Sequence, residues 1–255
     1  MPLLRIAAAQ SSSVPGDVRE NLRRHMPFVR AAAAEGVSLL LFPELSLTGY
    51  EPPLLPHHLL SPDGPVLAPM RELARRHRMT VIVGAPVRPI AGSKPAIGAI
   101  CLYPDGSGAT YRKRFLHTGE EAFASPGDVD THCMDLTTER VSLAICADTV
   151  HAEHPRWARE AGATVYVAGV LWSRAGYAAD AALMQAHAAE HGMAALVANH
   201  SSPTGGYASA GMSAFWKPGG ALAITAPPTG DHLVVAELRH GAWSGTCMEV
   251  PPPAD

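Results

Sequence analysis

The sequence lacks the long hydrophobic segments and the charge clusters that mark two common classes of partner. Apolar runs such as Leu39–Phe42 and Val165–Val170 are far shorter than the ~18 residues of a membrane-spanning helix. Charged residues are only 17% of the 255 residues, and 20 Lys and Arg nearly balance 23 Asp and Glu. Because no basic cluster stands out, nucleic acid is not expected as a partner. With 47% hydrophobic residues, we expect a globular protein that binds a small molecule.

Cysteines are few and widely spaced. The sequence holds no C-x-x-C pair, and its four cysteines are Cys101, Cys133, Cys146 and Cys247. This spacing argues against a zinc ribbon and against a dense disulfide framework. The first residues carry one early positive charge and no cleavage site before strand-like sequence, so no signal peptide is expected. We therefore expect a protein of the reducing cytoplasm, where one of these cysteines can be reactive.

Short apolar runs bounded by Gly, Pro, Asp and Asn recur along the chain. They predict strands, several buried on both faces, at Leu3–Ala9, Val37–Phe42, Thr80–Gly84, Ile97–Leu102, Val141–Cys146, Thr164–Val170, Ala194–Ala198, Ser209–Phe215 and Leu233–Leu238. Helical spacing predicts helices at Asp17–Glu35, Pro65–Arg78, Ala152–Ala161 and Ala178–Gly192. Pro27 lies inside the first helix, so a kink or a break is expected there. This alternation, without linker or repeat, predicts a single α/β domain over residues 1–255.

Glu44 directly follows the apolar segment Leu39–Pro43. A carboxylate at the end of a strand and beside apolar residues is partly removed from water. This desolvation raises its pKa and suits it to act as a general base. A glutamate in an exposed loop would give the same pattern, and this segment alone does not separate the two.

Lys113 lies between Arg112 and Arg114. Alternate residues of a strand face opposite sides, so Lys113 points inward if the two arginines face solvent. An inward lysine needs a carboxylate partner. The simpler interpretation of three consecutive cations is a solvated edge strand.

Cys146 ends the apolar run that begins at Val141 and precedes the predicted helix at Ala152. A cysteine in this position can lie on a sharp strand–turn–helix elbow, where backbone N–H groups stabilise developing negative charge. The alternative is an inert core cysteine, because cysteine is among the most buried residue types. Asp148, two residues further on, is expected to cap the helix.

Together these segments resemble the nitrilase superfamily of carbon–nitrogen hydrolases, whose members carry Glu, Lys and Cys in that chain order. The similar segments are Leu41-Phe42-Pro43-Glu44 with Thr48-Gly49-Tyr50, Tyr111-Arg112-Lys113 with Pro126-Gly127-Asp128, Cys146-Ala147-Asp148, Val197-Ala198-Asn199, Gly211-Met212-Ser213 and Pro218-Gly219-Gly220. The resemblance covers nearly the whole chain. It implies a four-layer αββα sandwich that pairs into a homodimer or a larger homo-oligomer. The chain departs from the family pattern at Ala147, at Val150–Glu153 and at His187. These departures leave the shape of the pocket wall and the substrate class open.

The resemblance implies cysteine-dependent hydrolysis of a non-peptide C–N bond in a small amide, through a thioester and without a cofactor. Glu44 would be the general base and Cys146 the nucleophile, while Lys113 and the N–H of Ala147 would hold the oxyanion. A second glutamate that positions the lysine is assigned to Glu121, which keeps a two-residue step to Phe123, with Glu120 as the alternative. Residues expected to contact substrate, unless they are ordinary aromatic packing, are Tyr50 and Trp172.

Alternatives to an amidase remain open at the level of the sequence. Its length favours the compact amidase branch, including ω-amidase-like members, but an N-carbamoyl-amino-acid hydrolase or a nitrilase would use the same three residues. A catalytically inactive homodimeric binding protein is the alternative of another class, although no member of the triad is missing. No metal is expected, because the spacing of His151 and His154 is a weak signal for metal ligands.

Overall fold

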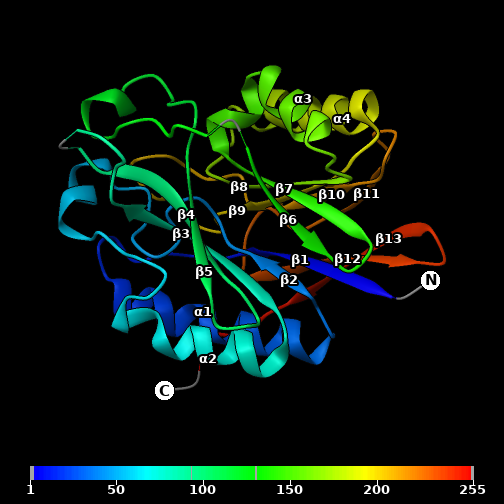
Figure 1. Cartoon of the computed structure of the whole chain (residues 1–255), viewed down its shortest axis with the longest axis horizontal. Coiled ribbons are helices and arrows are strands. Elements are labelled where there is room, and N and C mark those ends of the chain that lie inside the picture. The colour runs from blue at the N-terminus through cyan, green and yellow to red at the C-terminus, as the bar shows by residue number, and fades with distance from the viewer. Residues whose placement is uncertain (1–2, 93, 130, 254–255) are drawn as a thin grey trace.

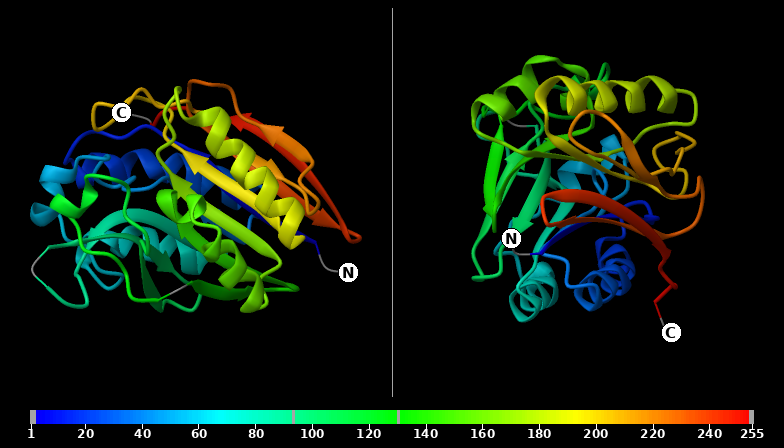
Figure 2. Two further views of the ribbon diagram at one scale, coloured as in Figure 1. Left: turned by 90° about the horizontal axis from the view of Figure 1, so that it is seen from above. Right: turned by 90° about the vertical axis from the view of Figure 1, so that its right-hand side faces the viewer.

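Two β-sheets pack face to face in the computed structural model, which describes residues 3–92, 94–129 and 131–253 (Figure 1). Helices α1 (Val18–Ala34) and α2 (Ala68–His77) cover the outer face of the seven-stranded sheet. Helices α3 (Glu153–Glu160) and α4 (Tyr177–His191) cover the outer face of the other (Figure 2). This arrangement confirms the predicted four-layer αββα sandwich.

The seven-stranded sheet has the order β13-β12-β1-β2-β3-β4-β5, and the six-stranded sheet has the order β11-β10-β9-β8-β7-β6. The first contains β1 (Leu4–Gln10), β2 (Leu39–Leu41), β3 (Thr80–Val87), β4 (Ala96–Leu102), β5 (Gly108–Arg112), β12 (His232–Arg239) and β13 (Ala242–Glu249). The second contains β6 (His132–Leu136), β7 (Glu139–Ile145), β8 (Val165–Val170), β9 (Ala194–Asn199), β10 (Ala214–Trp216) and β11 (Leu222–Thr225). The strands β1-β2-β3 and β7-β8-β9 are parallel. Short 3-10 helices are η1 (Pro52–His57), η2 (Pro65–Leu67), η3 (Glu120–Ala122) and η4 (Cys146–Val150).

The central strands are buried on both faces, as predicted. In β1, Leu4 and Ile6 enter the core between the sheets, whereas Ala7 packs under the helices on the outer face. In β8, Val167 faces the core between the sheets and Tyr166 faces the helices on the opposite side. Because each face of a strand takes every second residue, two buried faces produce an unbroken apolar run.

Each of the nine predicted strands overlaps an observed strand, although the run Ser209–Phe215 becomes a strand only at Ala214. The strands that the apolar runs miss, β5, β6, β11 and β13, all lie at sheet edges. Most of their residues are exposed or only partly buried, and in β13 these two classes largely alternate. One exposed face and one open edge leave too few apolar residues for an apolar run.

Helix α1 continues without a break through Pro27, so the predicted break is wrong. A proline inside a helix removes one backbone hydrogen bond. The side chains that follow it, Phe28, Val29 and Ala32, are buried against the sheet, and this packing holds the helix together across the proline. None of the helices in the described part of the chain is both long and apolar enough to cross a membrane.

The core between the sheets predicts the effect of truncating a strand of the six-stranded sheet. Leu143 in β7 is fully buried in this core, so Leu143→Ala should lower the free energy of unfolding by about 2–5 kcal/mol. Leu222 in β11 is 53% exposed, and Leu222→Ala should change it by no more than about 0.5 kcal/mol. Urea denaturation of both variants measures the difference, and equal losses would contradict this description of the core.

Candidate active site

Three side chains singled out in the sequence meet where strands of both sheets end. Glu44 lies shortly after β2, Lys113 directly follows β5, and Cys146 directly follows β7. Two antiparallel pairings, β3 with β4 and β4 with β5, give β5 the direction of β3 and hence of β2. The ends of these strands therefore lie at the same edge of the seven-stranded sheet.

The turn that carries Glu44 is held closely by both sheets. A Cβ atom on Gly84 of β3 would lie 2.3 Å from the Pro43 carbonyl oxygen, and one on Gly169 of β8 would lie 2.7 Å from the Phe42 carbonyl oxygen. Both positions therefore require glycine. The Glu44 carbonyl oxygen also accepts a hydrogen bond of 2.7 Å from Nε2 of His200, whose pKa is lowered to about 4 by burial.

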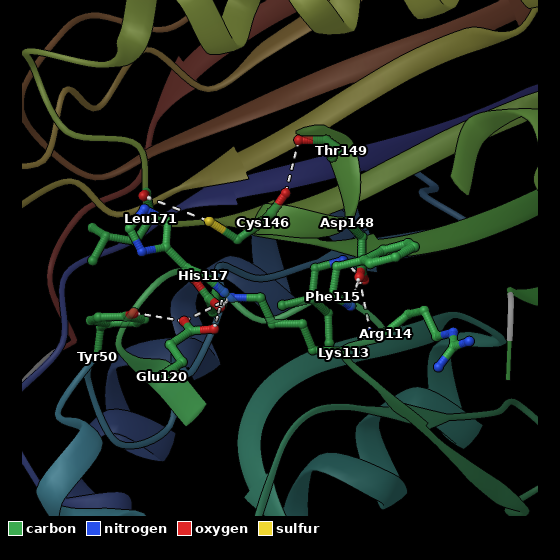
Figure 3. Close-up of polar contacts among 12 residues, drawn as sticks. Tyr50, Lys113, Arg114, Phe115, His117, Glu120, Cys146, Asp148, Thr149 and Leu171 are labelled. Carbon is green, nitrogen blue, oxygen red and sulfur yellow. Dashed lines mark hydrogen bonds and ion pairs between the residues drawn. The ribbon is translucent and has the colours of Figure 1, made fainter. Parts of the chain in front are cut away.

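Lys113 is completely buried between two carboxylates (Figure 3). Its Nζ donates to Oε1 of Glu44 at 2.6 Å and to Oε1 of Glu120 at 2.8 Å. Burial alone would lower the pKa of Lys113, but the negative charges of Glu44 and Glu120 outweigh it and raise the pKa. The lysine therefore keeps its charge, and the interpretation of this segment as a solvated cationic strand is wrong.

Glu120 accepts hydrogen bonds from three residues. Besides Lys113, it accepts a hydrogen bond of 2.6 Å from the Tyr50 hydroxyl and one of 2.8 Å from the backbone N–H of His117. Figure 3 shows Tyr50 and Lys113 converging on this carboxylate. The side chain is buried, so these bonds fix both its own position and that of the ammonium group.

The position assigned to Glu121 therefore needs correction. Glu121 is exposed, and its carboxylate accepts a hydrogen bond from the backbone N–H of Gly119, outside the site. The prediction relied on the two-residue step from Glu121 to Phe123, with Glu120 as the alternative. These residues instead form the 3-10 helix η3, in which neighbouring side chains point about a third of a turn apart. Glu120 consequently faces Lys113, and Glu121 faces solvent.

Cys146 lies on a strained elbow between β7 and η4. Its φ of 43° is in the left-handed region, which is unfavourable for a residue with a side chain. Burial raises the pKa of the Cys146 thiol well above its usual value, and the Glu44 charge raises it further. Burial likewise raises the pKa of Glu44 to about 7, against the opposing effect of Lys113. A protonated thiol therefore lies near a carboxyl group that titrates close to neutral pH.

Asp148 links the elbow to the segment that carries Lys113. This buried carboxylate accepts four hydrogen bonds of 2.7–2.9 Å, from the N–H groups of Ile145, Arg114 and Phe115 and from the hydroxyl of Tyr111. One donor precedes Cys146 and two follow Lys113, so a single side chain holds both backbones. The sequence indicated only a helix cap at this position.

The two histidines considered as metal ligands have separate environments. Nε2 of His154 lies 2.9 Å from the Tyr111 hydroxyl, and its Nδ1 lies 2.8 Å from the Tyr166 hydroxyl, behind the elbow. His151 instead stacks on Phe115, with ring centroids 3.9 Å apart. In the described part of the chain, no three His, Cys, Asp or Glu side chains are grouped so that they could hold a metal ion.

A cavity of about 480 Å³ opens in front of Cys146 and Glu44. The three residues predicted to contact substrate, Tyr50, Ala147 and Trp172, all line it. Because the Tyr50 hydroxyl is bonded to Glu120, this residue offers the cavity chiefly its ring. Ala147 is the second residue of η4, where a backbone N–H has no acceptor within the helix.

Sequence reasoning missed two further residues that support this cavity. Asn199 ends β9; it accepts a hydrogen bond of 2.9 Å from the N–H of Trp172 and donates one of 3.1 Å to the carbonyl oxygen of that residue. His200 follows and holds Glu44, as described above. Asn199 is the last residue of a buried strand and His200 directly follows it. Lys113 and Cys146 likewise directly follow strands, so the same signal could have identified these two residues.

Comparison with known proteins identifies the family. Residues 5–246 match the carbon–nitrogen hydrolase family. The chain belongs to this family. A double mutant of the amidase from Nesterenkonia sp. AN1, solved in complex with acrylamide, has a similar structure, with a TM-score of 0.84 and 25% identity over 93% of this chain and 91% of that chain.

The match to two curated relatives of this carbon–nitrogen hydrolase covers less than two thirds of each relative's length. An (R)-stereoselective amidase of a Pseudomonas species is 27% identical over 64% of this chain and 59% of that protein. A glutamine-dependent NAD(+) synthetase of Thermotoga maritima is 28% identical over 66% of this chain. The match spans only 29% of the synthetase.

The contrast between Glu120 and Glu121 predicts two different losses of stability. In Glu120→Gln, the amide must turn an N–H group toward Lys113 and Tyr50 or toward the N–H of His117. This substitution should lower the free energy of unfolding by about 1–3 kcal/mol. Glu121→Gln is the matched control at an exposed position and should change it by no more than about 0.5 kcal/mol. Urea denaturation measures both, and a larger loss in the control would contradict the assignment.

Proposed function

We propose that this protein hydrolyses the C–N bond of a small amide through a thioester on Cys146 and releases ammonia or an amine. The observation that carries the proposal is the Lys113 ammonium, which is buried between Glu44 and Glu120 beside a cavity lined by Cys146. The Nesterenkonia amidase supports it, because a mutant of that enzyme shows covalent addition of the acetamide moiety of fluoroacetamide at its active-site cysteine.

Glu44 is suited to act as the general base. Lys113 holds its Oε1. Its buried Oε2 accepts no hydrogen bond from a nitrogen or oxygen atom of the described residues, and the Cys146 thiol is near enough to affect its pKa. In our proposal, Glu44 takes the thiol proton as Sγ attacks the amide carbon. The same carboxyl group then gives this proton to the leaving nitrogen as the C–N bond breaks.

The carbonyl oxygen becomes negatively charged when sulfur attacks, and it then needs nearby donors. We assign this role to the Lys113 ammonium and to the backbone N–H of Ala147. In the second half of the reaction, Glu44 takes a proton from water, whose oxygen attacks the thioester. The C–S bond breaks, the acid leaves, and the proton returns to Cys146. Glu120 touches no reacting atom in this scheme and positions Lys113.

The proposal requires no cofactor. We further propose that the protein acts in the cytoplasm as a homodimer or a larger homo-oligomer, as the family resemblance implies. The four cysteines are free, which agrees with a reducing compartment.

Release of ammonia from small amides, N-carbamoyl amino acids and nitriles tests the proposal directly. Wild type should release ammonia from an amide, and Cys146→Ala should release none above background, because the nucleophile is lost. Carbamoyl compounds or nitriles as better substrates would favour the corresponding alternative. A complete absence of turnover, together with alkylation of Cys146 no faster than that of buried Cys101, would favour the inactive binding protein.

The pH dependence of kcat/KM follows from the raised pKa of Glu44. Below pH 7 this carboxyl group is increasingly protonated and cannot accept the thiol proton, so kcat/KM should fall about tenfold for each pH unit. Above pH 7 it should approach a plateau. A pH profile of ammonia release with an inflection near 7 is expected, since kcat/KM reports groups of the free enzyme. A profile that is flat between pH 5 and 8 would exclude Glu44 as the base.

A further inference from the structure

Asp180 is an ionisable residue of the cavity wall that the proposed mechanism does not use. It lies in the first turn of α4 and lines the same cavity as Cys146. The side chain is partly buried, and its carboxylate makes no hydrogen bond or ion pair with any described residue. A Cβ atom added at Gly176 would lie only 3.1 Å from Oδ2 of Asp180, so the glycine leaves this side of the carboxylate uncovered.

The described lining of the cavity contains no lysine or arginine that could neutralise Asp180. Lys113, which is assigned to the oxyanion, is fully buried and already paired with two carboxylates. Burial raises the pKa of Asp180, and His117, another wall residue, lowers it electrostatically. The cavity therefore presents an acidic side chain that has no lysine or arginine beside it among the described lining residues.

We infer that the preferred substrates are amides that carry a protonated amino group, and that Asp180 binds this group. The inference rests on the proposed amide hydrolysis and specifies its substrate class. A partly buried carboxylate without a partner is costly, and a charge-assisted hydrogen bond from an ammonium group removes this cost. An amide that itself carries a carboxylate would instead place this negative charge near Asp180, with no lysine or arginine in the described lining to compensate. Simple ω-amides of dicarboxylic acids and N-carbamoyl amino acids are therefore disfavoured.

Pairs of amides with the same shape and different charge test this inference. In each pair the ammonium group of one member replaces a methyl group of the other: glycinamide and propionamide, β-alaninamide and butyramide, γ-aminobutyramide and valeramide. For the best pair, wild type should show a kcat/KM at least about tenfold higher for the cationic member. Succinamate, which carries a carboxylate, should be a poorer substrate than the neutral amides.

Two variants on α4 separate the local effect of Asp180 from that of net charge. Asp180→Asn should reduce the ratio of kcat/KM between the cationic and neutral members to about one. Glu190→Gln removes the same charge from an exposed position of the same helix and should leave the ratio unchanged. A wild-type ratio near one in every pair, or a ratio that survives in Asp180→Asn, would overturn the inference while amide hydrolysis stands.

Equilibrium binding keeps the test independent of turnover. Each amide pair is titrated into the Cys146→Ala variant with and without Asp180→Asn, followed by NMR shifts of the protein. Tighter binding of the cationic member that requires Asp180 is expected, and equal binding of both members would overturn the inference. If wild type hydrolyses none of the amides, amide hydrolysis fails, and this titration still decides whether Asp180 selects a cation.

Discussion

The buried ammonium group of Lys113 is the constraint on which the site depends. A lone charge in the protein interior costs several kcal/mol, and removing one partner of a buried pair is strongly destabilising. The two carboxylates that compensate it, Glu44 and Glu120, come from segments 69 and 7 residues away in the chain. Keeping this charge paired therefore draws together the loop after β2, the end of β5 and the turn η3. Burial of this cluster raises the pKa of Glu44 to about 7, although Lys113 acts in the opposite direction.

Cys146, the proposed nucleophile, depends on a second set of bonds. A non-glycine residue at positive φ costs on the order of 1–3 kcal/mol, and Cys146 is held in that conformation by its surroundings. Asp148 contributes to this restraint, because three of its four hydrogen bonds join the backbone before the elbow to the backbone after Lys113. The turn of Glu44 is held from the other side by Gly84 and Gly169, where any side chain would collide with it. The relative positions of Glu44 and Cys146, the proposed base and nucleophile, are thus set by backbone contacts of both sheets.

Features set by a local sequence pattern could be predicted, whereas features set by contacts between distant residues or by a turn without a clear pattern could not. Strands buried on both faces produce unbroken apolar runs, so the sandwich core and the ends of β2 and β7 could be located from the sequence. Edge strands such as β13 leave no such pattern. Glu120 and Glu121 are adjacent and chemically identical, and only the 3-10 turn, a local geometry without a clear pattern, decides which one faces Lys113. Asp148 has the local pattern of a helix cap, while its contacts with Arg114 and Phe115 span 34 and 33 residues.

Asp180 in the cavity wall and Cys146 belong to different layers of the sandwich, but hydrogen bonds connect the segments that carry them. Helix α4 carries Asp180 on the outside of the six-stranded sheet. Its buried His187 donates a hydrogen bond of 2.7 Å from Nε2 to the carbonyl oxygen of Thr149 in η4. Thr149 in turn donates to the carbonyl oxygen of Cys146 at 2.8 Å. Two hydrogen bonds therefore connect the helix that presents the cavity carboxylate to the residue that would attack the substrate. Such a connection keeps the separation between the two nearly constant, so a substrate held at both ends would be selected by its length as well as by its charge.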